Sequence, residues 1–282
     1  MPRALRRAVP DNDEALARWL RLGNEVDPST IRVVLVDIDG VLTPGEGATA
    51  EPELLARVAS WNDAAAVDPA MPAISLCSGR QEPYVELLAQ LTHAFLPCLF
   101  EHGAGMLDPR GFRFTFNPAL GPSPWRAVAA MRAALDGLVS SGRAFVQPGK
   151  EATLTLYPIA PMTVGELAAA AEDAAAPAGS TFRVTPNIRA VELRPPGIDK
   201  GAGARWLAEH LGIPLRSFAG VGDADDDLTF LRVVGYSAAP ANASSSVRST
   251  ARYVATRPFG EGLMEILQHL VDVNRRVGTA SM

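Results

Sequence analysis

The sequence predicts an α/β protein whose core is a doubly wound parallel sheet, with a smaller α+β layer inserted into it. Two observations support this fold class. Short apolar runs alternate along the chain with segments of helical periodicity, which is typical of βαβ units and a parallel sheet. The middle of the chain then departs from this rhythm for far more than the dozen or so residues that a simple crossover needs.

Continuous apolar runs mark the core strands, because a strand buried on both faces of a parallel sheet carries few polar residues. Amphipathic segments mark the helices that cover the sheet. The core strands are expected at 31–36, 73–77 and 217–221, and the core helices at 51–60, 83–91 and 200–211.

The inserted layer has a strand pattern of its own. Ala152, Leu154 and Leu156 alternate with two threonines, which indicates a sheet with one polar face. Strands are expected at 111–116, 151–157, 181–184 and 189–193, and helices from 123 to about 142 and over 163–175.

The chain is expected to have four parts. They are an N-terminal extension (1–30), a core domain (31–105 and 195–271), an inserted domain (106–194) and a C-terminal tail (272–282). Within the extension, residues 11–22 are predicted to form a short amphipathic helix that docks on the core.

Composition excludes several classes of protein. A net charge of −5 is unfavourable for nonspecific nucleic-acid binding, which depends on lysine and arginine. No apolar run approaches the length of a membrane span, and no apolar stretch that would make a secretory signal follows the N-terminal arginines. We therefore expect a cytoplasmic protein without nucleic-acid or membrane partners. Cys77 and Cys98 are expected as two buried thiols, although one disulfide is an alternative.

Two carboxylates, Asp37 and Asp39, follow the first predicted strand. Side chains there point into the crevice where open α/β sheets bind ligands. One carboxylate can attack phosphorus while the other protonates the leaving group and later activates water. Taken alone, however, such a pair is more often a simple turn.

Two further segments suit a phosphate group. Ser78 and Gly79 follow the second strand, where a hydroxyl and backbone N–H groups can bind phosphate oxygens; a loop turn is the alternative. Lys200 opens a predicted helix, where a cation opposes the helix dipole. An anion to bind explains this lysine, and a solvated side chain is the competing interpretation.

An acidic cluster, residues 223–227, follows the third strand and contains four carboxylates in five residues. Such a cluster needs abundant solvent or a cation, and Mg²⁺ prefers oxygen ligands. We expect Asp37 and Asp223 to bind Mg²⁺ directly, Asp39 through its backbone carbonyl, and Asp227 directly or through water.

Taken together, these segments resemble the four motifs of the haloacid-dehalogenase-like (HAD) hydrolase superfamily. The matching residues are Asp37 with Asp39, Ser78, Lys200, and Asp223 with Asp227. The resemblance extends over about 31–271. Two positions depart from the usual pattern: Val41 replaces a frequent threonine, and Asp226 replaces a frequent asparagine, which leaves the relative closeness of Asp226 and Asp227 to the metal open.

The resemblance implies a Rossmann-like core with a C2-type cap of subtype B, as in Cof-like sugar phosphatases, archaeal phosphoglycolate phosphatases and phosphomannomutases. It also implies a phosphatase with an aspartyl-phosphate intermediate on Asp37. Asp39 fills the acid/base position, so a phosphatase or phosphotransferase is favoured over a dehalogenase. Phosphate would be bound by Ser78, Gly79 and Lys200.

Substrate choice is assigned to the cap, where the signals are weaker. Candidates for contact with the leaving group are Arg80, Lys150, Glu151, Asn187 and Arg189. The expected activity is a Mg²⁺-dependent phosphomonoesterase acting on a small phosphorylated metabolite, a sugar phosphate or a phosphoglycolate-like acid. A phosphomannomutase-like phosphotransferase and a non-catalytic binding module are the alternatives, and the chain is expected to be a monomer or homodimer.

Overall fold

The computed structural model describes residues 12–24, 26–176 and 182–280, so the start of the predicted extension and position 181 lie outside the described residues. Its largest sheet is parallel and five-stranded, as the alternation of apolar runs and helices predicts. Strand β1 (Val33–Val36) is fully buried and lies at an interior position between β10 and β2. The order is β12 (Tyr253–Val254), β11 (Tyr236–Ala239), β10 (Phe218–Val221), β1, β2 (Ala73–Leu76).

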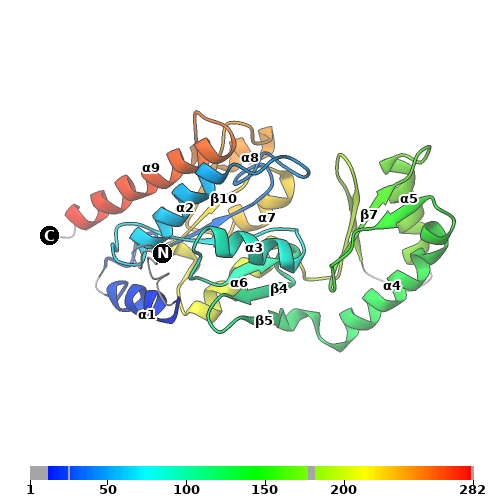
Figure 1. Cartoon of the computed structure of the whole chain (residues 1–282), viewed down its shortest axis with the longest axis horizontal. Coiled ribbons are helices and arrows are strands. Elements are labelled where there is room, and N and C mark those ends of the chain that lie inside the picture. Colours follow the sequence, from blue (N-terminus) through cyan, green and yellow to red (C-terminus); the bar gives the residue numbers. More distant parts are fainter. Residues whose placement is uncertain (1–11, 25, 177–181, 281–282) are drawn as a thin grey trace, which may run out of the picture.

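Helices cover both faces of this sheet (Figure 1). The side chains of Val34 and Val36 join one hydrophobic cluster and those of Val33 and Leu35 the other, which is why β1 is apolar throughout. The first cluster is covered by α2 (Pro52–Ala65), α3 (Glu82–Leu91) and α9 (Phe259–Ala280), and the second by α1 (Asn12–Leu22), α6 (Lys200–Leu211), α7 (Leu228–Leu231) and α8 (Ser245–Thr250).

A three-stranded antiparallel sheet continues from the edge of the core. Its order is β3 (Cys98–Phe100), β4 (Gly105–Asp108), β5 (Arg113–Phe116), and a bridge between Cys77 and Leu99 joins it to the strand end of β2. We expected the strand at 111–116 in the inserted layer. It pairs instead with β4 through a short hairpin, because consecutive antiparallel strands need only a tight turn.

The remaining sheet forms a separate layer, hereafter the cap. Its strands are antiparallel, and in Figure 1 the sheet lies between its two helices and the core. The helices are α4 (Pro122–Ser140) and α5 (Val164–Ala175), and the strand order is β6 (Ala144–Val146), β7 (Leu154–Pro158), β9 (Val191–Arg194), β8 (Arg183–Pro186). The limits of 106–194 for an inserted domain stay a prediction.

The cap sheet has one apolar and one polar face. Leu154, Leu156, Val191 and Leu193 pack with the cap helices in a hydrophobic cluster of their own. The alternate positions on β7 and β9 carry threonine, tyrosine, glutamate and arginine, as the alternation in the sequence predicts. This polar face is the one turned to the core.

The two ends of the described chain are helical. Helix α1 buries Leu16 and Trp19, and the Trp19 ring lies edge-on to Phe95 at 6.1 Å, as expected of a docking helix. Helix α9 continues to Ala280, so most of the predicted tail extends this helix. Cys77 and Cys98 are free and buried, as expected. Across the described residues, no helix has both the length and the apolar character that crossing a membrane requires.

Candidate active site

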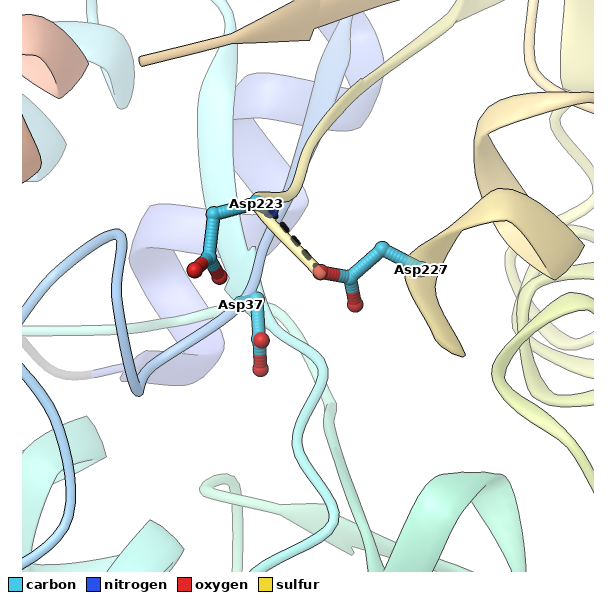
Figure 2. Close-up of side chains that lie close together, drawn as sticks. All are labelled: Asp37, Asp223 and Asp227. Atoms are coloured by element: carbon cyan, nitrogen blue, oxygen red, sulfur yellow. Dashed lines mark hydrogen bonds between the residues drawn. The ribbon is translucent and has the colours of Figure 1, made fainter. Parts of the chain in front are cut away.

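Three neighbouring strands bring the predicted motif residues together. Asp37 follows β1, Ser78 follows β2 and Asp223 follows β10, and β1 pairs in register with both of the other strands. Parallel strands end at the same sheet edge, so these residues converge although they are far apart in sequence. Figure 2 shows Asp37 and Asp223 close together, with Asp227 beside them.

Asp37 is a buried carboxylate that lies beside a lysine. Only 5% of the residue is exposed, and its Oδ1 accepts a hydrogen bond of 2.8 Å from the backbone N–H of Ile38. The ammonium of Lys200 lies 2.8 Å from the same oxygen. Lys200 is the first residue of α6, whose N-terminus is capped by the side chain of Asp199. Its position at the helix start is therefore explained by the carboxylates that it contacts.

Asp227 holds the loop that carries the acidic cluster. It is fully buried, and its Oδ1 accepts a hydrogen bond of 2.6 Å from Lys200. Its Oδ2 accepts hydrogen bonds from the backbone N–H groups of Asp223 (2.9 Å) and Ala224 (3.0 Å). The former is the dashed line in Figure 2. Both oxygens thus have protein partners, which favours a positioning role or a water-mediated contact for Asp227 over direct metal binding.

Asp223 has the opposite environment. Its Oδ1 is buried and has no hydrogen-bond partner among the described residues, which is costly for a carboxylate oxygen. Ligand atoms of Asp37, Asp223 and Asp227 all lie within 4.8 Å of one another. Gly40 makes the approach possible, since a Cβ there would lie 2.1 Å from Asp223 Oδ2. An unpartnered buried oxygen beside two further carboxylates fits a hard divalent cation such as Mg²⁺.

The charges of the site explain its pKa shifts. Burial, followed by the charge of Asp227, raises the pKa of Asp223 to about 7. The same two causes raise the pKa of Asp37 well above its ordinary value, against the opposing effect of Lys200. The carboxylates Asp227 and Asp37 in turn raise the pKa of Lys200, although its burial acts in the other direction. The carboxylates of Asp37, Asp223 and Asp227 thus lie around the Lys200 ammonium, and a bound metal cation would reduce the repulsion between them.

Asp39 lies at the same edge but is bound to Arg80. The guanidinium donates from Nε to Asp39 Oδ2 at 2.6 Å and from Nη2 to Oδ1 at 2.8 Å. Ser78 is buried, and its Oγ accepts a 3.2 Å hydrogen bond from the backbone N–H of Arg80. Gly79 is required here, because a Cβ would lie 2.4 Å from the ring of His102.

These residues face a cavity of about 680 Å³ between the core and the cap. A volume of this size suits a small metabolite. The core contributes Asp37, Asp39, Glu46, Ser78, Gly79, Arg80, His102 and Lys200, and the cap contributes Gln147, Lys150, Tyr157, Asn187, Ile188, Arg189 and Glu192.

The predicted specificity residues take different positions around this cavity. Lys150 is buried and pairs with Glu192 at 3.1 Å, and the side chain of Asn187 accepts two backbone hydrogen bonds within its own turn. Glu151 is exposed and is not among the cavity-lining residues. Arg189 lines the cavity and forms no ion pair with any described residue; its Nη1 donates to the backbone carbonyl of Glu46 at 3.1 Å.

An ion-pair network joins the cap to the core and was missed by sequence reasoning. His102 lies between Asp226 of the core (Nδ1 to Oδ2, 2.9 Å) and Glu192 of the cap (Nε2 to Oε2, 3.3 Å). Arg194 is buried and reaches Asp226 at 2.5 Å. The pairs formed with His102 and Arg194 lower the pKa of Asp226 despite its burial. Asp226 therefore pairs with Arg194 of the cap and His102 of the core and is not a member of the carboxylate cluster.

Glu46 and Tyr157 are the other residues that the sequence did not single out. The Tyr157 hydroxyl donates a short hydrogen bond to Glu46, which also accepts one from Arg80 at 3.2 Å. Neither residue belongs to a motif, and their positions in a loop and on a cap strand became informative only when the fold placed them together. The alternation of apolar and polar residues along β7 does place Tyr157 on the polar face of the cap sheet, and this was the feature of the sequence that could have indicated its role.

Comparisons with known proteins agree with this geometry. A family model described as haloacid dehalogenase-like hydrolase matches residues 166–267. A phosphoglycolate phosphatase of Methanothrix thermoacetophila is 46% identical over 81 residues, which is 29% of this chain and 36% of that protein. Several relatives of the same name match over a similar third of their length. One from Natronomonas pharaonis is 26% identical over 84% of this chain and 96% of its own.

Solved structures share the fold at low sequence identity. A protein of Thermoplasma acidophilum superposes with a TM-score of 0.66 and 19% identity, covering 86% of this chain and 98% of its own. The sucrose-phosphatase of Synechocystis, solved with sucrose and phosphate, gives a TM-score of 0.63 at 14% identity, covering 86% and 98%. The family match over residues 166–267, the shared fold and the convergence of the motif residues at one sheet edge make this chain similar to the haloacid dehalogenase-like hydrolases.

Proposed function

We propose that the protein is a Mg²⁺-dependent phosphomonoesterase that hydrolyses a small phosphorylated metabolite through a phosphoryl-enzyme intermediate on Asp37. One observation supports this most strongly. A buried carboxylate at the end of the interior strand β1 contacts a buried lysine at 2.8 Å, beside Asp223 and Asp227, and both the carboxylate and the lysine line a cavity under the cap. A nucleophile, a lysine that binds the phosphate anion and carboxylates that bind a metal cation, here Asp37 with Asp223, are the parts that phosphoryl transfer needs.

In the first half of the reaction, Asp37 attacks phosphorus and the bond between phosphorus and the leaving oxygen breaks. Oδ1 of Asp37 accepts the hydrogen bonds from Ile38 and Lys200, so we assign the attack to Oδ2. Lys200, the Ser78 hydroxyl and neighbouring backbone N–H groups bind the non-bridging phosphate oxygens. Asp39 donates a proton to the leaving alcohol, which therefore departs neutral.

In the second half, Asp39 removes a proton from water, which attacks the phosphorus of the aspartyl-phosphate and releases inorganic phosphate. Mg²⁺, held by Asp37 and Asp223 with the Asp39 carbonyl, would neutralise charge on the phosphate and on the carboxylates. Asp227 holds Lys200 and the 223–224 loop in place. The cap excludes bulk water from the cavity and contacts the leaving group.

Arg189 favours a substrate whose leaving group is an acid. It is a cavity-lining guanidinium of the cap, and it forms no ion pair with a carboxylate in the described part of the chain. Lys150 and Arg80, by contrast, already pair with Glu192 and with Asp39 and Glu46. A phosphoglycolate-like acid would supply the missing carboxylate, whereas a sugar phosphate would not. This agrees with the names of the relatives reported above.

The test is a panel of phosphate esters assayed for phosphate release with Mg²⁺ and with a chelator. The panel includes 2-phosphoglycolate, several sugar phosphates, and 2-hydroxyethyl phosphate as the uncharged counterpart of the acid. We expect Mg²⁺-dependent release that is fastest with 2-phosphoglycolate. Asp37→Asn should lose activity by at least about a thousandfold while still unfolding in a cooperative thermal transition, because the amide keeps the shape of the side chain but is not a nucleophile.

The matched arginine variants test the substrate class. Arg189→Met should raise KM for 2-phosphoglycolate by about 10- to 100-fold, the value of one charge-assisted interaction, and leave 2-hydroxyethyl phosphate unaffected. Arg113→Met changes an exposed arginine of β5 outside the cavity and serves as the control.

Near wild-type turnover of Asp37→Asn would contradict the mechanism. Phosphoryl transfer to a second sugar without phosphate release would identify a phosphotransferase, and inactivity across the panel a binding module.

We expect a cytoplasmic protein, for which two free, buried thiols are suitable. The oligomeric state, monomer or homodimer, also stays a prediction.

A further inference from the structure

Asn242 joins the loop that carries Asp39 to the start of helix α9. It follows β11, the strand next to β10 in the core sheet, and is half-buried. Its Nδ2 donates a hydrogen bond of 2.9 Å to the backbone carbonyl of Gly40, and its Oδ1 accepts one of 2.8 Å from the backbone N–H of Phe259, the first residue of α9. Because one partner is an acceptor and the other a donor, only one orientation of the amide satisfies both.

The turn that presents this side chain, residues 240–244, also contacts the acidic loop. The backbone N–H of Ala243 donates to the carbonyl of Pro240 at 3.1 Å, and the Ala243 side chain is buried in a core cluster, so the turn is anchored. The backbone N–H of Ser244 donates to the carbonyl of Asp223 at 2.8 Å. One turn thus holds both backbone segments that carry the proposed Mg²⁺ ligands.

These two segments touch at Gly40. Its φ is +88°, which favours glycine, and a Cβ there would lie 2.1 Å from Oδ2 of Asp223. The N–H of Gly40 donates to the carbonyl of Thr43 at 2.7 Å. The carbonyl of Asp39 lies in the same peptide plane as this N–H and points the opposite way, so the bond fixes its direction. The contact with Asn242 fixes the next peptide plane, and both planes that meet at Gly40 are therefore held.

We propose that Asn242 is a positioning residue that sets the spacing between Asp223 and the segment of Asp39 and Gly40 for Mg²⁺. The inference rests on the proposed phosphatase function, in which these segments bind the metal. Asn242 itself is not among the cavity-lining residues. Mg²⁺ requires nearly ideal octahedral geometry, so a small shift of one segment weakens binding. Without the amide, repulsion between the carboxylates of Asp37 and Asp223 acts to separate the segments.

The test measures the affinity of the metal-free protein for Mg²⁺ by isothermal titration calorimetry, without substrate. Asn242→Ala removes both side-chain hydrogen bonds, and Asn242→Leu removes them while nearly keeping the volume of the side chain. Thermal unfolding in the presence of a chelator shows that each variant is folded and gives its Tm. The leucine variant keeps the test valid if the alanine variant does not fold.

Asn274→Ala on α9 is the matched control. The Asn274 side chain also bridges backbone groups, since it accepts from the N–H of Ile31 at 2.9 Å and donates to the carbonyl of Ile31 at 2.8 Å. Ile31 precedes β1, whereas Asp37 follows it, so this contact lies at the opposite end of the same strand. The control therefore removes the same kind of contact away from the proposed metal site.

We expect the Kd for Mg²⁺ to rise about tenfold in both Asn242 variants, as is typical of residues that orient metal ligands. Asn274→Ala should lower the Tm at least as much, because a buried side chain loses three hydrogen bonds, and should keep the wild-type Kd. At saturating Mg²⁺, kcat of the Asn242 variants should return to within about twofold of wild type, because the bound metal then holds the segments together.

Wild-type affinity for Mg²⁺ in the Asn242 variants would overturn the inference. An equal loss of affinity in Asn274→Ala would also do so, since metal binding would then follow overall stability. Binding is measured without substrate, so the proposed function can fail separately. A wild type that binds Mg²⁺ but hydrolyses no ester would refute the phosphomonoesterase, while weaker binding by the Asn242 variants would still support the positioning role.

Discussion

Asp223 and Asp227 lie four residues apart in one loop and experience opposite environments. Asp227 stabilises the folded loop, because its two carboxylate oxygens accept three hydrogen bonds, one of them from a buried lysine. Asp223 has a buried oxygen without a partner among the described residues and lies beside two other carboxylates. In the metal-free protein, the Asp227 carboxylate is expected to stabilise the fold and the Asp223 carboxylate to destabilise it.

Substitution by asparagine should therefore have opposite effects at the two positions. We predict that Asp227→Asn lowers the free energy of unfolding by about 3–5 kcal/mol, the cost of breaking a buried ion pair. Asp223→Asn should raise it, because one of the repelling charges is removed. Urea unfolding in the presence of a chelator measures both. Equal destabilisation by the two variants would contradict this assignment of roles.

The raised pKa of Asp223 makes stability depend on pH in a defined direction. Its pKa rises from 3.8 to about 7 on folding, so the native state binds this proton more tightly than the unfolded chain does. The folded state is penalised fully above about pH 7 and not at all below about pH 4, and metal-free stability falls as pH rises between them. Mg²⁺ bound at Asp223 would remove the penalty by pairing with the charged carboxylate.

Addition of Mg²⁺ should consequently raise the Tm more at about pH 8 than at about pH 5.5, where Asp223 keeps its proton. Differential scanning calorimetry at the two pH values makes the comparison. Asp223→Asn is the control, and in this variant the dependence on pH should be largely lost. A stabilisation by Mg²⁺ that is greater in acid would be evidence against cation binding at Asp223.

The positions of the motif residues could be predicted because the ends of buried strands can be recognised in a sequence. Asp37, Ser78 and Asp223 each follow one of three apolar runs, and the parallel sheet brings the ends of these runs together at one edge. The contacts of Arg80 and Asp226 could not be predicted in this way. Their partners, Asp39 and His102, are 41 and 124 residues away, and side-chain pairing over such separations leaves no periodic pattern.

At the scale of elements, Glu101 connects the core to the cap. This buried residue has a positive φ of 47°, and its carboxylate accepts hydrogen bonds from the backbone N–H groups of Glu151, Ala152 and Thr153 and from the Thr153 hydroxyl. Four donors on one carboxylate fix the start of the segment that leads into β7. That strand carries Tyr157, so Glu101 sets the geometry of one side of the cavity.

Glu101→Gln should loosen this segment, because an amide can accept on one oxygen only. We expect amide hydrogen exchange of residues 151–153 to become at least about tenfold faster, equivalent to one lost charge-assisted hydrogen bond. Exchange in β1 should stay slow. Glu86→Gln, a half-buried glutamate on α3 away from the cavity, is the matched control. Unchanged protection at 151–153 would show that the loop is held by other contacts.

Elements with strong periodicity were predicted well, and short ones were not. The runs at 31–36 and 73–77 correspond to β1 and β2, and the alanine-rich helix to α5. Strands β11 and β12 were missed because they have four and two residues and owe their existence to pairing with β10 and with each other. Strand β5 was found but placed in the wrong layer, since alternation does not specify a pairing partner.

At the scale of the whole molecule, the core and the cap have separate hydrophobic interiors. The cap cluster consists of residues from α4, α5 and the four cap strands, and the two core clusters contain none of them. Between the layers lies a small apolar cluster, which consists of Ala104, Leu120, Ala152 and Ile198. The other contacts between the layers are largely polar, through Glu46, Glu101, His102 and Asp226. Such an arrangement permits the cap to unfold without the core.

Calorimetry should therefore resolve two transitions, with a calorimetric enthalpy greater than the van't Hoff enthalpy. Leu154→Ala, in the cap interior, should lower one transition by several degrees and leave the other in place, and Leu35→Ala in β1 should do the reverse. A single cooperative transition, shifted equally by both variants, would mean that the polar contacts bind the layers into one folding unit.

The buried thiols have a consequence for observing this protein. Cys77 directly precedes Ser78 at the end of β2, and Cys98 begins β3; burial raises the pKa of both thiols, so neither ionises in the folded chain. A thiol-specific reagent can consequently react only with molecules in which these strands have separated. The labelling rate therefore measures how often the sheet edge that carries Ser78 opens.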